Sequence, residues 1–129
     1  MTQSDRLSIL VVDDEPAIGQ LVRRYLEDDA IDLTIAVTGA EALEAATKIP
    51  KLSLLLTDVM MPELEGHELA RQLRQRDPDL KVLYLTGHAD HLFDAKQQLW
   101  ALEAFLEKPF TKESLRQAVA QLAFGRLQL

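Results

Sequence analysis

The chain has 129 residues, of which 47% are hydrophobic and 27% charged, and it contains 5 glycines, 5 prolines and no cysteine. This size and composition predict one packed domain and exclude a disulfide framework, a cysteine nucleophile and cysteine-based zinc modules. The 14 basic and 21 acidic residues give a net charge of −7, which argues against direct nucleic-acid binding, because phosphate backbones attract clustered lysines and arginines.

The apolar stretches predict neither a signal peptide nor a membrane-spanning helix. The apolar stretch Leu7–Val12 runs into an acidic pair and is too short for a signal peptide. No stretch approaches the roughly 20 apolar residues of a membrane-spanning helix. We therefore expect no membrane insertion, a cytoplasmic location, and a single domain over 1–129 with its core at about 7–123 and a tail over 124–129.

Short apolar runs rich in Leu, Val and Ile recur along the chain. Such runs are typical of parallel strands that are buried on both faces. The second run is weaker than the others. In chain order, the predicted strands cover Ser8–Val12, Asp32–Val37, Leu52–Thr57, Leu80–Thr86 and Ala104–Glu107.

Helical patterns lie between these strands. The first follows Pro16, a residue favoured in the first turn of a helix, and its apolar residues recur at helical spacing. The second begins at Thr38, which with Glu41 has the spacing of a capping box, and Pro50 is expected to close it.

The second half of the chain continues the alternation. The third helix is expected to end at Asp77-Pro78, and a fourth is expected within Ala89–Leu99. The last helix repeats the apolar spacing from Leu115 to Ala123. Five serial βα units predict an open, doubly wound parallel sheet of five strands with helices on both faces, which is a three-layer α/β sandwich.

Polar residues end four of the predicted strands. Asp13 and Asp14 follow the first strand, Asp58 the third and Lys108 the fifth, while Thr86 ends the fourth. Taken alone, each could be a helix cap, a turn residue or a surface charge. Because ligands of open α/β sheets bind beyond the carboxyl ends of the strands, their joint placement predicts a functional site.

The residue types indicate the chemistry of this site. Three clustered carboxylates repel one another, and oxygen ligands favour a hard divalent cation such as Mg²⁺. With Lys108, one such ion neutralises the three aspartates. Phosphoryl transfer then follows as a hypothesis, in which Asp58 is the nucleophile and forms an acyl phosphate. Lys108 and the Thr86 hydroxyl would contact the new phosphoryl oxygens.

Four segments in this order resemble the receiver domains of response regulators in two-component signalling, the CheY-like superfamily. The resemblance covers nearly the whole chain and implies a flavodoxin-like (βα)5 fold. The segments are Ile9–Glu15, Asp58–Pro62 with Gly66, Leu85–Gly87 and Glu107–Phe110.

The resemblance assigns roles to individual residues. It implies that Asp58 is the phosphoacceptor and that Asp13, Asp14, Asp58 and the backbone carbonyl of Met60 bind Mg²⁺, for which Mn²⁺ is an expected substitute. It also implies that Thr86 is the switch hydroxyl. The remaining implied features are Lys108 as the ion-pair partner of the phosphoryl group, Phe105 as the aromatic switch, a cis peptide bond before Pro109, and an output face that includes Leu92, Phe93 and Trp100.

The resemblance also implies partners and leaves alternatives. The phosphodonor would be a histidine kinase or a histidine phosphotransfer protein, and the output would be a downstream protein or an attached domain, with a phosphorylation-dependent dimer as a further expectation. The domain would be a switch and not an enzyme. One alternative is a phosphorylation-independent interaction module. Another is a hydrolase of the haloacid dehalogenase type, which is disfavoured because Met60 occupies the position of its second acid. The sequence leaves open whether the chain is a complete regulator or part of a longer one.

Overall fold

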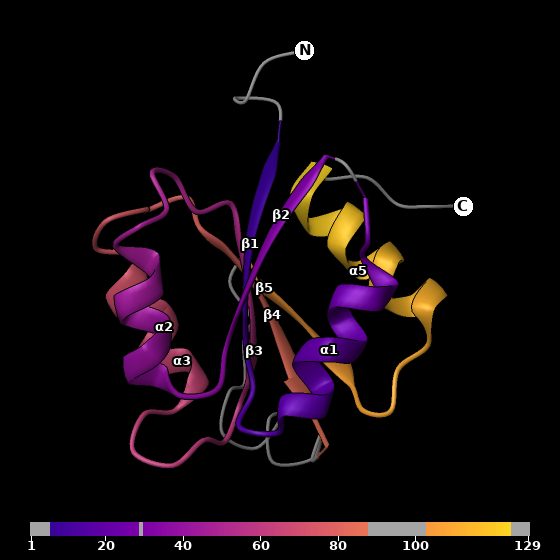
Figure 1. Ribbon diagram of the computed structural model, residues 1–129, viewed down its shortest axis with the longest axis horizontal. Coiled ribbons are helices and arrows are strands. Elements are labelled where there is room, and N and C mark those ends of the chain that lie inside the picture. The colour runs from indigo at the N-terminus through magenta and orange to yellow at the C-terminus, as the bar shows by residue number, and fades with distance from the viewer. Residues whose placement is uncertain (1–5, 29, 88–102, 125–129) are drawn as a thin grey trace.

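The chain forms a five-stranded parallel sheet between two layers of helices (Figure 1). The structure, a computed structural model, describes residues 6–28, 30–87 and 103–124. The strand order is β2-β1-β3-β4-β5, and every neighbouring pair is parallel. The strands are β1 (Leu7–Val12), β2 (Ile31–Ala36), β3 (Leu54–Asp58), β4 (Lys81–Thr86) and β5 (Glu103–Glu107).

Helices cover both faces of this sheet. In Figure 1, α1 and α5 lie on one face, and α2 and α3 lie on the other. The arrangement confirms the predicted three-layer α/β sandwich. The helix expected within Ala89–Leu99 lies outside the described residues. The described helices are α1 (Pro16–Tyr25), α2 (Gly39–Ala46), α3 (Gly66–Leu73) and α5 (Lys112–Phe124).

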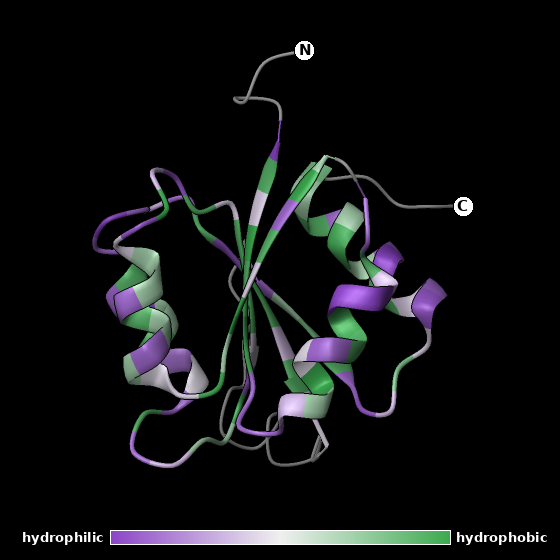
Figure 2. Cartoon of the chain, viewed as in Figure 1, coloured by the Kyte–Doolittle hydropathy of each residue, from purple (hydrophilic) through white to green (hydrophobic). Residues whose placement is uncertain are grey.

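Two hydrophobic cores lie on opposite faces of the sheet. Successive side chains of a strand point to opposite faces, so Leu54 packs with the α1 and α5 side while Leu55 packs with the α2 and α3 side. Both leucines are fully buried. Figure 2 shows hydrophobic residues along the strands and hydrophilic residues recurring in the helices. Burial on both faces explains why β1 and β3 appear in the sequence as continuous apolar runs.

The predicted capping box of α2 is present in the structure. The Thr38 hydroxyl accepts a hydrogen bond from the Glu41 N–H at 3.0 Å, and the Glu41 carboxylate accepts one from the Val37 N–H at 2.8 Å. These bonds satisfy donors that have no partner within the helix.

The predicted ends of two helices were too late. α2 ends at Ala46, well before Pro50, because the Thr47 hydroxyl donates to the Glu44 carbonyl at 2.6 Å and begins a turn. Likewise α3 ends at Leu73, and turns lead from there to Asp77. Proline stops a helix from continuing, but local hydrogen bonds can end the helix earlier.

Two strands begin one or two residues later than predicted. β3 begins at Leu54 and β4 at Lys81, although Leu52 and Leu80 were predicted to be in strands. Both leucines are buried, with 1% exposure each. An apolar run therefore reports burial, whereas the strand boundary depends on pairing with the neighbouring strand.

A buried polar network ties α3 to β4 and β5. Arg74 Nη1 donates to the Glu103 carboxylate at 2.9 Å, and the Tyr84 hydroxyl donates to the same oxygen at 3.1 Å. The Arg74 Nε also donates to the Leu80 carbonyl at 3.0 Å. Burial and the Glu103 carboxylate together raise the pKa of the Tyr84 hydroxyl, so it stays protonated and keeps donating. The network fixes the start of β5 against α3.

Replacing Arg74 with alanine should destabilise the domain. The substitution leaves the Glu103 carboxylate buried without this guanidinium, which typically costs about 3 kcal/mol. Urea unfolding measures the loss. Arg71→Ala is the matched control, because Arg71 lies in α3, which ends one residue before Arg74, but pairs with Glu68 at the surface. Equal losses for the two variants would show that the buried network contributes no more than a surface ion pair.

Candidate functional site

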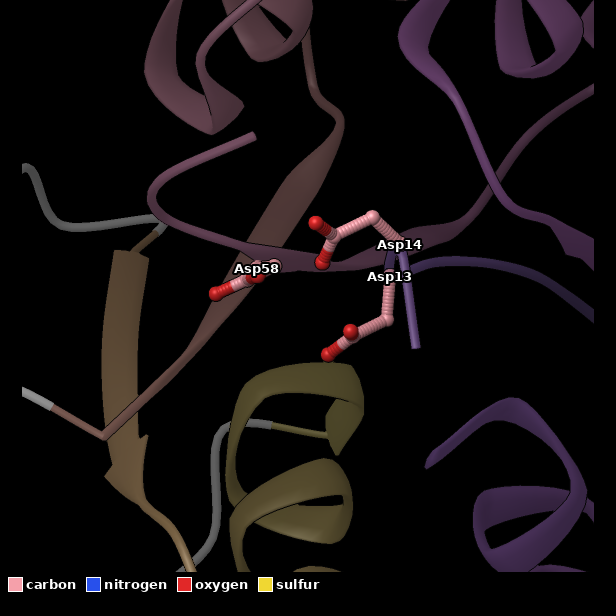
Figure 3. A group of neighbouring side chains, drawn as sticks. All are labelled: Asp13, Asp14 and Asp58. Carbon is pink, nitrogen blue, oxygen red and sulfur yellow. The ribbon is translucent and has the colours of Figure 1, made fainter. Parts of the chain in front are cut away.

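Three aspartates meet where the strand connections diverge. β2 and β3 lie on opposite sides of β1, and ligands of such sheets bind at this reversal, beyond the carboxyl ends of the strands. Asp13 and Asp14 directly follow β1, and Asp58 ends β3. Carboxylate oxygens of the three lie within 4.8 Å of one another, and Figure 3 shows the side chains beside one another at this edge.

Asp13 is the buried member of the group, with 2% exposure. Its Oδ1 accepts a hydrogen bond from the Glu15 N–H at 2.9 Å, just before α1 begins. Its Oδ2 forms an ion pair with the Lys108 ammonium at 2.8 Å. The Asp13 carboxylate is therefore fixed by contacts on both oxygens, whereas Asp14 is exposed.

Lys108 lies among several carboxylates. Its Nζ is 3.7 Å from Asp58 Oδ1 and 3.7 Å from Glu15 Oε1, in addition to its contact with Asp13. Burial alone would lower the pKa of Lys108, but the neighbouring carboxylates, Asp13 foremost, raise it. The ammonium is thus charged at neutral pH.

The backbone around Lys108 is also held in place. Its N–H donates to the carbonyl of Thr86 at 2.7 Å, which joins the end of β5 to the end of β4. The Lys108–Pro109 peptide bond, which the resemblance implies to be cis, is cis in the structure. Thr86 itself is buried, with 3% exposure.

The Asp58 carboxylate has a perturbed pKa. Its pKa is raised from 3.8 to about 6 by burial first and then by the negative charges of Asp13 and Asp14, while Lys108 and the Val59 N–H act in the opposite direction. One ammonium therefore does not balance the acidic cluster. A divalent cation or a proton would relieve the remaining repulsion.

The raised pKa of Asp58 predicts a pH-dependent cost in the metal-free protein. Because the folded state binds this proton more tightly than the unfolded state, the free energy of unfolding should fall as pH rises from about 4 to about 6 and stay lower above that range. A two-unit shift corresponds to about 3 kcal/mol in full, which solvent screening reduces to about 1 kcal/mol.

Asp58→Asn tests this prediction because it removes the ionisable group. In metal-free buffer the variant should exceed the wild type in free energy of unfolding by about 1 kcal/mol at about pH 7.5 and by much less at about pH 4. Urea unfolding at both pH values measures the difference. The same difference at both pH values would contradict a raised pKa.

The loop between β3 and α3 contains a non-glycine residue with positive φ. Glu63 has φ 73°, in the left-handed region that costs most residues about 1 kcal/mol or more. Asparagine tolerates this conformation better than glutamate.

Glu63→Asn should therefore raise the free energy of unfolding by about 0.5–1 kcal/mol. Glu63→Ala is the control: it removes the same carboxylate but keeps a Cβ with no local hydrogen-bonding group, so it should bring no such gain. Thermal or urea unfolding compares the two. A gain for alanine equal to that for asparagine would mean that the charge, and not the backbone, is responsible.

The other predicted site residues differ in where they lie. Phe105 is partly buried and packs against the core on the α2 and α3 face, opposite Tyr84 in the register of β5 and β4. Met60 is 56% exposed, and among the described residues nothing donates a hydrogen bond to its carbonyl. The three predicted output-face residues, Leu92, Phe93 and Trp100, lie outside the described residues.

Three features of the site were not predicted from the sequence. Glu15 lies close enough to Lys108 to compete for it, and its position directly after the acidic pair was the available signal. The Thr57 hydroxyl donates to the Asp58 carbonyl at 3.0 Å, and the signal was a hydroxyl in an apolar run. Gly66 lies close to Asp58, and nothing in the local sequence predicts this contact except the glycine itself.

The residues present fit a magnesium ion. The donor set consists of hard oxygens from three carboxylates, and the Met60 carbonyl in the same loop has no donor among the described residues. The net negative charge that raises the pKa of Asp58 is the charge that such an ion would neutralise.

Sequence comparisons connect this geometry to a known family. The family described as the response regulator receiver domain matches residues 9–120. The response regulator receiver protein CpdR of Brucella abortus is 36% identical over 102 residues, which are 79% of this chain and 84% of that protein. The sensor kinase CckA of Brucella abortus is 32% identical over 120 residues, which are 92% of this chain and 13% of that protein.

Solved structures give the same result. The response regulator protein TrrA from Thermotoga maritima, in complex with Mg²⁺ and BeF, superposes with a TM-score of 0.75 at 31% identity, covering 90% of this chain and 98% of that one. A sensor protein from Polaromonas sp. JS666 superposes with a TM-score of 0.80 at 26% identity, covering 93% and 98%.

The relatives differ in how much of their length this chain spans. It covers 13% of CckA, 24% of the transcriptional regulatory protein DctD of Pseudomonas aeruginosa and 10% of the sensor protein EvgS of Escherichia coli. The chain thus spans most of CpdR but only a small part of these longer relatives. Within the described part of the chain, no helix is long and apolar enough to cross a membrane.

Proposed function

The chain belongs to the response regulator receiver family, and we propose that Asp58 is its phosphoacceptor in a Mg²⁺-dependent signalling switch. Receiver domains are signalling domains and not conventional enzymes. The observation that carries the proposal is the cluster of Asp13, Asp14 and Asp58 within 4.8 Å, with the Lys108 ammonium beside it.

The chemical step is the transfer of a phosphoryl group from a phosphohistidine. A carboxylate oxygen of Asp58 attacks phosphorus, the P–O bond forms, and the P–N bond to the imidazole breaks. The imidazole leaves with the bonding electron pair and takes up a proton. The product is an acyl phosphate on Asp58. Because attack needs the ionised carboxylate, whose pKa is about 6 in the metal-free site, the reaction should favour neutral over acidic pH.

Asp13, Asp14, Asp58 and the Met60 carbonyl would hold the metal ion. When bound, Mg²⁺ neutralises the carboxylates and orients oxygens of the transferring phosphoryl group. Asp13 is suited to this task because its orientation is already fixed by Glu15 and Lys108. We regard Mn²⁺ as an alternative ion for the same oxygen ligands.

The phosphorylated site would be read by Lys108 and Thr86. Phosphorylation of a carboxylate adds negative charge beside Lys108, whose Nζ is 3.7 Å from Asp58, and it supplies oxygens that accept from both residues. Movement of Thr86 at the end of β4 would favour a new position of Phe105 on the adjacent β5. The partner-binding face, with Leu92, Phe93 and Trp100, would change with it.

The partners follow from the same chemistry. The donor would be a histidine kinase or a histidine phosphotransfer protein, and the recipient of the signal would be a downstream protein, an attached output domain or a second copy of the domain. The sequence similarity of this chain to parts of the sensor kinase CckA and of the sensor protein EvgS supports a kinase-linked pathway. The missing second acid at Met60 disfavours a haloacid dehalogenase-type hydrolase.

Phosphorylation of Asp58 can be tested by intact mass spectrometry after incubation with acetyl phosphate. The wild type with Mg²⁺ should gain one phosphoryl group, about 80 Da, because the ion neutralises the acidic cluster. Neither the wild type with EDTA nor Asp58→Asn with Mg²⁺ should gain it.

Beryllofluoride separates a short-lived product from an inert site. If no adduct accumulates but the wild type forms a Mg²⁺-dependent beryllofluoride complex that Asp58→Asn lacks, the phosphoryl group is lost rapidly and the proposal stands. If neither adduct nor complex forms, the domain acts as a phosphorylation-independent interaction module.

A further inference from the structure

Thr57 has a contact that its place in a strand does not require. It is fully buried in β3 directly before Asp58, and its hydroxyl donates to the Asp58 carbonyl at 3.0 Å. Valine has a similar shape, a strong preference for strands and no polar group to desolvate. Strand formation and burial therefore account for the methyl group of Thr57 but not for its hydroxyl.

The segment after Thr57 is held on a second side by the start of α3. The Gly66 N–H donates to the Val59 carbonyl at 2.9 Å. A Cβ on Gly66 would lie 2.3 Å from the Asp58 carbonyl oxygen and 3.1 Å from the Thr57 methyl carbon, so only glycine allows this approach. The carbonyls of Asp58 and Val59 thus both have a donor, and the next carbonyl, that of Met60, has none among the described residues.

We infer that Thr57 is a positioning residue for the metal site: its hydroxyl, together with Gly66, fixes the backbone between Asp58 and Met60 and thereby aims the Asp58 carboxylate and the Met60 carbonyl at the ion. This inference rests on the proposed function. Thr57 acts through the backbone and does not contact the metal or the phosphoryl group.

The physical basis is the orientation of successive peptide planes. Asp58 is the last residue of β3, and beyond it the ladder of strand hydrogen bonds no longer restrains the chain. A hydrogen bond to the Asp58 carbonyl fixes the peptide plane that joins Asp58 to Val59. The bond from Gly66 fixes the following plane. Small rotations of either plane would move the Met60 carbonyl relative to the carboxylates of Asp58 and Asp13.

Two substitutions separate positioning from folding. Thr57→Val keeps the shape and removes the hydroxyl, whereas Thr57→Ser keeps the hydroxyl and removes the methyl group that packs beside Gly66. In metal-free buffer, Thr57→Ser should be the less stable of the two, because it loses buried apolar surface. The order should be reversed for Mg²⁺ affinity, with Thr57→Val binding Mg²⁺ more weakly than Thr57→Ser.

The probe is Mg²⁺ alone, titrated into the wild type, Thr57→Val, Thr57→Ser and Asp58→Asn. Isothermal titration calorimetry gives the dissociation constants, and NMR spectra give the chemical shifts of the backbone amides. Thr57→Val should raise the Mg²⁺ dissociation constant about five-fold, the change expected for one neutral hydrogen bond. Thr57→Ser should stay close to the wild type. In the spectra of metal-free Thr57→Val, amide shifts relative to the wild type should be concentrated between Val59 and Gly66.

The outcomes distinguish this inference from the function on which it rests. Wild-type Mg²⁺ affinity in Thr57→Val overturns the positioning role and leaves the proposed function intact. If the less stable variant also binds Mg²⁺ more weakly, the positioning role is overturned as well, since Thr57 then has a structural role only. If the wild type does not bind Mg²⁺, or Asp58→Asn binds it as well as the wild type does, the metal site itself is wrong and both proposals fail.

Discussion

The properties of the site depend on electrostatic repulsion among carboxylates that the fold of the sheet holds close together. Asp13, Asp14 and Asp58 approach within 4.8 Å, and Lys108 supplies one ammonium group against them. Because the site is partly dehydrated, the repulsion is less screened than at an open surface, and it adds to the effect of burial in raising the pKa of Asp58 to about 6. A cation or a proton relieves it, so the charge of the site is coupled to whatever binds there. In the proposed function, this coupling underlies the affinity of the site for a metal ion and its response to an added phosphoryl group.

The repulsion persists because rigid elements hold each participant. β1 and β3 are adjacent strands in the interior of the sheet, with hydrophobic cores on both faces, so their ends cannot move apart without exposing apolar surface. The Lys108 N–H, bonded to the Thr86 carbonyl, attaches the ammonium group to the same frame. Hydrophobic burial thus offsets the cost of keeping like charges together. A site held in this way needs little rearrangement when an ion binds.

Buried polar contacts support the sheet both near the amino ends and near the carboxyl ends of its strands, with different consequences. At the edge opposite the aspartates, the network of Arg74, Glu103 and Tyr84 fixes the start of β5 and contributes to stability. At the aspartate edge, the Thr57 hydroxyl and Gly66 restrain the backbone that follows β3. The Arg74 network contributes to the free energy of unfolding, whereas the contacts of Thr57 and Gly66 are proposed to affect metal affinity. The two sets of contacts therefore separate the requirements of folding from those of binding.

The sequence by itself determined the identity and order of the described elements and the residues at the strand ends, because apolar periodicity, the Thr38 capping box and the acidic pair are local features of the chain. It also indicated the family through four motifs. It did not determine that α2 ends at Ala46, which depends on local hydrogen bonds that proline spacing does not reveal. Only the tertiary structure decided that β1 lies beside β3 and that Lys108 is closer to Asp13 than to Asp58. These features depend on distances and burial between segments far apart in the chain, and no local pattern encodes either quantity.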